Sequence, residues 1–133
     1  MPTGKSAVEG ECDRLAKAYG YTVHRLSQVR HSRIVWGLPD RRYVNLVLGV
    51  ALFFECKGER DRLTEDQYDF LRDELTCGCF ASCGGVDELK ELLEAVRGER
   101  RQAMSLALSQ VEALRFKGFR KVAGRPCRSA ADR

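Results

Sequence analysis

The chain has 133 residues and a net charge of +4, and it is 44% hydrophobic and 32% charged, which is typical of one globular domain. No apolar run approaches the ~20 residues that span a membrane, and the first residues lack the apolar core of a signal peptide, so we expect a cytoplasmic protein with no membrane partner. Residues 97–133 carry ten Lys or Arg and three acids, a basic arm that indicates either a polyanion partner or a solubilising tail.

The apolar spacing predicts a first helix over residues 6–19. Ser6 and Glu9 form a capping-box pattern at its start, and Gly20 suits its end. Glu9 and Glu11 both lie in the N-terminal half of this helix. As a cap partner, Glu9 would have a purely structural role.

A short strand is predicted over residues 21–26, followed by a loop over residues 27–39. A positive loop with an aromatic residue suits phosphate contact and base stacking, although a solvated loop with its aromatic residue packed on the core fits equally well. The loop residues concerned are Arg30, His31, Arg33 and Trp36.

A hairpin is predicted next, with strands over residues 43–48 and 50–57 and a turn at Gly49. Asp40 stands at the entrance of this hairpin and Glu55 near its far end. A twisted hairpin can bring these two carboxylates to one edge of the sheet.

Strand side chains alternate between faces, so Glu55 and Lys57 are expected on one face and Cys56 on the other. A charged pair that closes an apolar run is unusual in a purely structural strand. Taken singly, Asp40 could be a turn residue after proline, and Glu55 with Lys57 a surface ion pair. Together, carboxylates beside an amine at strand ends suit a hard divalent cation and its water.

The second half of the chain is predicted to continue with a helix from Thr64, a strand over residues 79–83, a helix over residues 86–96 and a helix over residues 99–115. Gln67 stands at the capping-box position of the first of these helices. The connection between the third and fourth strands resembles a βαβ crossover, which predicts a small mixed sheet with helices on both faces. The apolar face within residues 103–114 needs a partner, either the body of the domain or a second subunit.

The cysteines favour buried thiols over a metal site. Without a secretory signal a disulfide framework is not expected. Cys77, Cys79 and Cys83 could form half a zinc site, but the spacing differs from paired CxxC knuckles and no histidine is near. A zinc or redox protein therefore remains a minor alternative.

The ordered set of motifs resembles the PD-(D/E)xK nuclease superfamily. More narrowly, it is similar to the VRR-NUC family of virus-type replication-repair nucleases, kin of the archaeal Holliday-junction resolvases. The match runs from about Glu9 to about Leu93, and it departs from the family pattern at Cys56, where an aliphatic residue is usual. The motifs that carry the resemblance are Glu9, Gly37-Leu38-Pro39-Asp40, Glu55-Cys56-Lys57 and Leu63-Thr64-Glu65-Asp66-Gln67.

The resemblance implies a restriction-endonuclease-like α/β core of about four strands in residues 1–96, with a C-terminal helix and basic tail in residues 97–133. It also implies a DNA endonuclease that uses Mg²⁺ or Mn²⁺ held by Asp40, Glu55 and the backbone carbonyl of Cys56. Glu9 would hold a second metal or an outer-shell water, with Glu11 as its competitor for this role. Lys57 would orient the attacking water, and Gln67 would either reach the site or simply complete its cap.

DNA contacts are expected from Arg30, His31, Arg33, Arg41 and Arg42 and from the basic tail. Stand-alone domains of this kind often act as homodimers on branched DNA such as Holliday junctions, which would suit a phage protein in a host cytoplasm. The alternative function is a catalytically silent DNA-binding or scaffolding module with the same fold.

Overall fold

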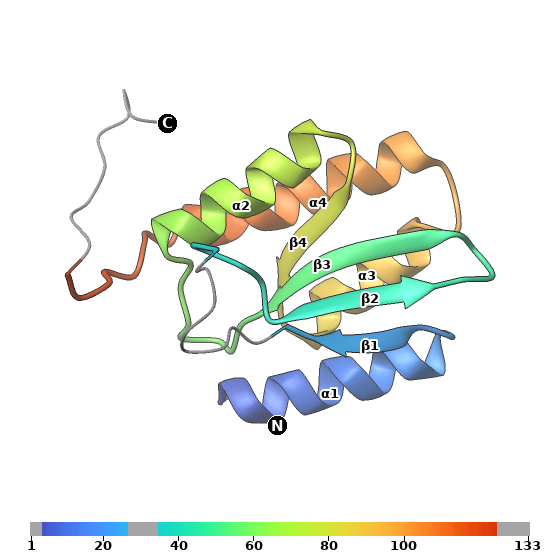
Figure 1. The fold of residues 1–133 in the computed structure, drawn as a ribbon, viewed down its shortest axis with the longest axis horizontal. Coiled ribbons are helices and arrows are strands. Elements are labelled where there is room, and N and C mark those ends of the chain that lie inside the picture. Colours follow the sequence, from blue (N-terminus) through green and yellow to red (C-terminus); the bar gives the residue numbers. More distant parts are fainter. Residues whose placement is uncertain (1–3, 27–34, 125–133) are drawn as a thin grey trace.

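The computed structural model describes residues 4–26 and 35–124 (Figure 1). Among these residues, four strands form one sheet in the order β1-β2-β3-β4, in which β4 runs parallel to β3 and the other neighbours are antiparallel. The predicted α/β class with a small mixed sheet is therefore confirmed. The elements in chain order are α1 (Lys5–Ala18), β1 (Thr22–Arg25), β2 (Arg41–Asn45), β3 (Val50–Cys56), α2 (Glu65–Thr76), β4 (Phe80–Gly84), α3 (Val86–Ala95) and α4 (Arg100–Arg115).

Helix α1 begins at Lys5 and has Gly4 as its N-cap, with no side-chain capping hydrogen bond. The predicted capping box of Ser6 and Glu9 is therefore wrong, because Ser6 already lies inside the helix. Glu9 is left free of a capping role and pairs with an arginine of the sheet instead. The buried side of the helix is formed by residues four apart: Val8, Cys12 and Ala16.

The β2–β3 hairpin sets the geometry of the sheet. Its register pairs Arg41 with Phe54 and Asn45 with Val50. Strand β2 ends at Asn45, earlier than predicted, because the Asn45 side chain accepts a hydrogen bond from Leu48 N (2.9 Å) and closes the turn. Gly49 has a φ of +68°, a conformation that favours glycine, so the predicted turn position is confirmed.

Helix α2 connects β3 to the parallel strand β4, as the predicted crossover requires. The capping box at its start is formed: the Thr64 side chain accepts from Gln67 N, and the Gln67 side chain accepts from Thr64 N. This cap fixes the side chain of Gln67 at the N-terminal end of the helix. The parallel register places Glu55 of β3 opposite Cys83 of β4.

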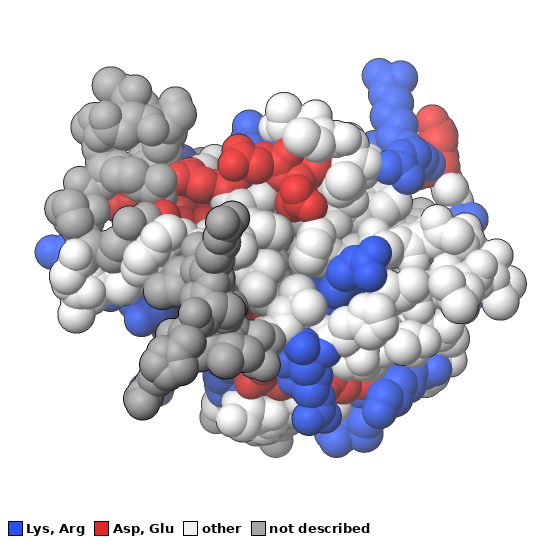
Figure 2. Space-filling view, in the orientation of Figure 1, with Lys and Arg blue, Asp and Glu red and all other residues white. Residues whose placement is uncertain are grey.

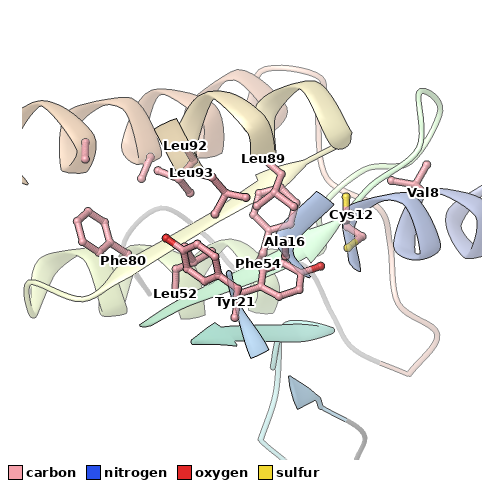
Figure 3. Close-up of a cluster of buried hydrophobic side chains, with 14 residues drawn as sticks. Val8, Cys12, Ala16, Tyr21, Leu52, Phe54, Phe80, Leu89, Leu92 and Leu93 are labelled. Atoms are coloured by element: carbon pink, nitrogen blue, oxygen red, sulfur yellow. The ribbon is translucent and has the colours of Figure 1, made fainter. Parts of the chain in front are cut away.

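Apolar side chains cover both faces of the sheet, as a mixed sheet between helices requires. Leu52 and Phe54 of β3 pack with residues of α1 and α3, including Cys12 and Leu92, in the cluster shown in Figure 3. A second cluster on the α2 side contains Leu63, Leu71, Ala81, Cys83, Val111 and Leu114. Glu55 therefore lies in a strand that is enclosed on both sides.

Helix α4 packs its apolar side against the body of the domain. Ala107 and Val111 are fully buried, and the Ser82 hydroxyl of β4 lies 2.7 Å from Gln110 Oε1 and 3.1 Å from the Ala107 carbonyl oxygen, to either of which it can donate its one proton. The suggestion that the face within residues 103–114 serves a second subunit is therefore wrong, because β4 and its neighbours already cover it. The predicted domain division near residue 97 stays a prediction. Across the described ranges, no helix combines the length and apolarity needed to cross a membrane.

Candidate active site

The candidate site lies at the end of the sheet where β2 begins and β3 ends, and the N-terminal ends of α1 and α2 lie at this same end (Figure 1). Arg41 of β2 pairs with Phe54 of β3. Asp40, which precedes Arg41, therefore lies close to Glu55, which follows Phe54. Asp40 N donates a hydrogen bond to Glu55 Oε1 at 3.1 Å. The register of the hairpin thus brings two carboxylates together that are fifteen positions apart in the chain.

Glu55 is the most enclosed group of the site, with 1% of its side chain exposed. Its Oε2 atom lies 2.9 Å from Lys5 Nζ, 3.3 Å from Lys57 Nζ and 3.3 Å from Gln67 Nε2. Burial, followed by the charge of Asp40, raises the pKa of Glu55 above its ordinary value, although both lysines act in the opposite direction. A positive charge close to Glu55 therefore stabilises its ionised form.

Lys57 follows β3 and is almost completely buried, with 4% of its side chain exposed. Its Nζ donates to Gln67 Oε1 at 3.1 Å, and the same oxygen accepts Thr64 N at 2.9 Å. Gln67 thus completes the cap of α2 and contacts Lys57 and Glu55 at the same time. The two roles that sequence reasoning treated as alternatives coexist in one side chain.

Lys5 is a site residue that the sequence did not reveal. Its Nζ lies 2.9 Å from Glu55 Oε2 and 3.3 Å from Asp40 Oδ2, so one ammonium group contacts both carboxylates. Partial burial disfavours the charged form of Lys5, but Glu55 and then Asp40 outweigh burial, so the pKa of Lys5 lies above its ordinary value. Lys5 is therefore a cation at neutral pH.

A second layer of charge lies behind Asp40 and links α1 to β2. Arg41 Nε donates to Asp13 Oδ1 at 2.9 Å, and its Nη1 lies 3.2 Å from Glu9 Oε2 and 3.1 Å from the Asp40 carbonyl oxygen. Tyr43 donates to the same Asp13 oxygen at 2.9 Å. Since Arg41 is 8% exposed and turned toward these carboxylates, it is not placed to meet a DNA phosphate, and that part of the prediction does not fit the structure.

The helical spacing of α1 explains how it serves this region. Lys5, Glu9 and Asp13 are four residues apart, so they share one side of the helix. The sequence contains this polar stripe beside the apolar stripe, but the stripe alone does not indicate that Lys5 contacts Asp40 and Glu55. Glu9 pairs with Arg41, and among the described residues no hydrogen bond or ion pair joins Glu9 to Asp40. Glu11 lines a cavity of about 550 Å³ that is also lined by Lys57 and by residues of α3 and α4.

The Gly-Leu-Pro-Asp segment docks against the start of α2. Gly37 has a φ of +78°, and a Cβ built on it would lie 2.0 Å from the Asp66 carbonyl oxygen. Pro39, two residues later, is fully buried. The missing side chain at Gly37 thus lets this segment and the N-terminal end of α2 approach closely, which places Asp40 and Gln67 around the same carboxylate.

Several predicted DNA contacts are placed differently or lie outside the structure. Arg30, His31 and Arg33 fall outside the described residues. Arg42 is half-buried and alternates to the opposite face of β2 from Arg41. Exposed basic side chains lie instead over α1 and β1, whereas acidic side chains gather over α2 (Figure 2). The exposed basic residues of α1 and β1 are Arg14, Lys17 and Arg25.

The donors at the site suit a hard cation held by few protein ligands. In residues 4–26 and 35–124, Asp40 Oδ2 is a buried oxygen that accepts no hydrogen bond, although Lys5 Nζ lies 3.3 Å away. A carboxylate oxygen in this state fits an ionic partner, and Mg²⁺ in particular is bound through one or two carboxylates with waters and phosphates. The described part of the chain contains no cluster of three or more His, Cys, Asp or Glu side chains arranged for a metal. The residues present therefore fit a site of two carboxylates better than an all-protein cage.

The cysteines lie apart from this chemistry. The thiol of Cys56 is buried on the face opposite Glu55, where a hydrogen bond with Cys12, followed by burial, raises its pKa. Cys83 is buried in β4, whereas Cys77 and Cys79 are exposed. Any contribution of Cys56 to the site would therefore come from its backbone carbonyl, which stays a prediction.

A comparison with solved structures identifies the fold. A structure described as a "VRR_NUC domain" superposes with a TM-score of 0.58 at 23% sequence identity, and the match covers 71% of this chain and 98% of that one. No family profile matches the chain, and no curated protein matches it. The chain therefore shares the fold of that VRR_NUC domain structure, as the motifs predicted.

Proposed function

We propose that this protein is a metal-dependent endonuclease that hydrolyses DNA phosphodiester bonds, with Asp40, Glu55 and Lys57 as its catalytic residues. The observation that carries the proposal is the convergence of Asp40 and Glu55 oxygens on one cationic point, with Lys57 3.3 Å from Glu55 Oε2. Glu55 is a buried carboxylate with a raised pKa beside a second carboxylate at the end of the sheet, and perturbed groups of this kind concentrate at functional sites.

The two carboxylates would hold Mg²⁺ or Mn²⁺ through their oxygens, with the Cys56 carbonyl as a further oxygen ligand. When bound, such a cation polarises the scissile phosphate and lowers the pKa of a coordinated water. Asp40 reaches the surface with 22% of its side chain exposed, whereas Glu55 is enclosed. Asp40 would therefore face the entering phosphate, and Glu55 would anchor the site from within.

Lys57 would act on the attacking water and on the charge that develops at phosphorus. Its ammonium is held by Gln67 and Glu55, so it is oriented before substrate arrives. Gln67 is a positioning residue in this scheme, because it fixes Lys57 while capping α2. Glu9 would act at one remove, by holding Arg41 against the Asp40 carbonyl or by orienting an outer water.

The charge distribution indicates how DNA would approach. Helix α2 carries five acids and one arginine, so it repels a phosphate backbone, whereas exposed arginines and lysines line α1 and β1 (Figure 2). The N-terminal end of α1 leads directly to Asp40 through Lys5. We therefore place the duplex along α1 and β1, with the basic tail as an additional contact. Affinity that falls steeply with salt in a gel-shift titration supports this contact, and a flat response refutes it.

The finer predictions concern substrate and assembly. We propose a preference for branched DNA, such as a four-way junction, which a homodimer would cut at two symmetric positions. Light scattering measures the assembly state directly. A location in the cytoplasm stays a prediction.

The test is a cleavage assay on linear, flapped and four-way DNA with Mg²⁺, Mn²⁺ or EDTA. We expect cleavage with either metal and none with EDTA. Asp40→Ala and Lys57→Ala should each lower the rate by about 10²–10⁴-fold, the range for loss of one positioned catalytic group. Asp73→Ala and Lys90→Ala, both on exposed helix positions, are matched controls that should cut at the wild-type rate.

Two outcomes would contradict the proposal. Wild-type rates in the Asp40→Ala and Lys57→Ala proteins would refute the site assignment. Salt-sensitive binding of branched DNA without cleavage under any metal would instead favour the silent DNA-binding module.

A further inference from the structure

The ammonium group of Lys5 lies where a cation shared by the two carboxylates would lie. Its Nζ is 2.9 Å from Glu55 Oε2 and 3.3 Å from Asp40 Oδ2. Lys57 also contacts Glu55 Oε2, but no ion pair joins it to Asp40 among the described residues. Lys5 is thus the positive group that both carboxylates share.

The two lysines of the site differ in how firmly they are held. Lys57 has 4% of its side chain exposed and is fixed by Gln67. Lys5 has 38% of its side chain exposed and stands at the first position of α1, directly after Gly4. Helix ends fray, and a long lysine side chain can turn its ammonium into water without disturbing the core. Lys5 can therefore leave the site, whereas Lys57 is built into it.

An ammonium and a divalent cation cannot share this position. Oxygen ligands approach Mg²⁺ to about 2.1 Å, closer than the contacts Lys5 makes here, so a bound cation would take up the same space between the two oxygens. Two positive charges a few ångströms apart in a partly buried site also repel each other strongly. Metal binding therefore requires that Lys5 withdraw.

We propose that Lys5 is an internal counter-ion that fills the cation site of the metal-free protein and is displaced when a divalent cation binds. This inference rests on the proposed function, since it assumes that Asp40 and Glu55 hold the metal. In the metal-free protein Lys5 neutralises two carboxylates that would otherwise repel each other at the end of the sheet. In the metal-bound protein Lys5 is displaced from the carboxylates. Because its ion pairs with Asp40 and Glu55 must break first, they lower the affinity of the site for the metal. Lys5 would set the metal concentration at which the nuclease becomes active.

The proposal makes two predictions of opposite sign for one substitution. Lys5→Met keeps the apolar stem and removes the charge. Without its competitor, the metal should bind more tightly, whereas the metal-free protein should melt at a lower temperature because the carboxylates lose their counter-ion. A lysine that merely supports the start of α1 would lower stability in both states and would not raise the affinity.

The experiment is a titration of the metal alone, without DNA, followed by calorimetry for Ca²⁺ and by electron paramagnetic resonance for Mn²⁺. We expect the dissociation constant of Lys5→Met to be about tenfold lower than that of wild type, since a hydrogen bond to a charged group is worth a factor of that order. Thermal unfolding in EDTA should give a midpoint lower by about 4–8 °C, and saturating Ca²⁺ should remove that difference. Lys90→Met, at an exposed helix position away from the site, is the matched control and should behave as wild type in both measurements.

The outcomes separate this inference from the proposed function. If wild type binds Mn²⁺ and cuts DNA while Lys5→Met binds Mn²⁺ no more tightly, Lys5 is not a competitor and the function stands. If neither protein binds Mn²⁺ or Ca²⁺ and wild type does not cut, the nuclease proposal fails and the inference fails with it. Binding by Lys5→Met at metal concentrations where wild type stays empty would be the strongest support.

Discussion

Gly37 is the position at which one methyl group should perturb the site most. Gly37→Ala would place a Cβ atom 2.0 Å from the Asp66 carbonyl oxygen, 2.3 Å from the Asp66 carbonyl carbon and 2.6 Å from Gln67 N. These neighbours are backbone atoms at the start of α2, which cannot rotate away as a side chain would. The segment that carries Asp40 and the helix that carries Gln67 must therefore separate.

The expected cost has two parts. The φ of +78° at Gly37 lies in the left-handed region, where an alanine costs about 1–2 kcal/mol. The backbone overlap adds a cost like that of overpacking a core, about 1–3 kcal/mol. We therefore expect Gly37→Ala to lower the free energy of unfolding by about 2–5 kcal/mol. Separation of the two segments should also lower the cleavage rate, because Gln67 would no longer hold Lys57 and Glu55.

Gly49→Ala is the matched control for this substitution. Gly49 has a similar φ of +68°, but nothing lies within 4 Å of the built Cβ. It should therefore show only the conformational cost, about 1–2 kcal/mol, and keep the wild-type cleavage rate. Urea unfolding at 25 °C followed by circular dichroism measures both variants. Equal destabilisation of the two proteins would refute the close approach of Gly37 to α2.

Three further predictions follow from the buried charges and thiols. Asp13→Ala leaves Arg41 buried with one fewer carboxylate, so it should cost about 3–5 kcal/mol in urea unfolding, whereas the exposed Asp73→Ala should cost under about 0.5 kcal/mol. Because the folded pKa of Glu55 is raised, its charge destabilises the metal-free fold above that pKa and ceases to do so as pH falls through it. Glu55→Gln should therefore be more stable than wild type in EDTA at about pH 8, and the difference should shrink toward about pH 5; an excess that grows with acid would contradict the raised pKa. Brief alkylation of the native protein, mapped by mass spectrometry, should label the exposed thiols of Cys77 and Cys79. The buried thiols should stay unlabelled, and their early labelling would show that the core opens: Cys12, Cys56 and Cys83.

The local elements were predictable because their signals are local. The capping box of Thr64 and Gln67, the glycine at the hairpin turn and the apolar spacing of the helices depend on residues a few positions apart. The failed cap at Ser6 shows the limit of such signals. A capping pattern fits several nearby starts, and the contact that Glu9 makes with Arg41 belongs to the tertiary structure.

The partners of the buried charges were not predictable in the same way. Arg41 looked like a DNA contact because basic residues near a catalytic motif commonly meet phosphates. The structure buries it against Asp13 and Glu9, because the alternation of β2 turns Arg41 toward α1 and Arg42 to the other face. Arg41 and Arg42 carry the same charge but lie on opposite faces of β2 and differ in burial, and the residue type specifies neither property.

The sequence by itself determined the order of the elements, the α/β class and the two strand ends at which the predicted site residues lie. Asp40 stands directly before the start of β2, and Glu55 and Lys57 stand at the end of β3. These follow from periodicity and turn chemistry, which are short-range properties of the chain. The tertiary structure alone decided that Lys5 joins both carboxylates and that one side chain, Gln67, caps α2 and contacts Glu55 and Lys57 at once. Contacts between groups fifty positions apart depend on how helices pack on a sheet, and no local pattern encodes that distance.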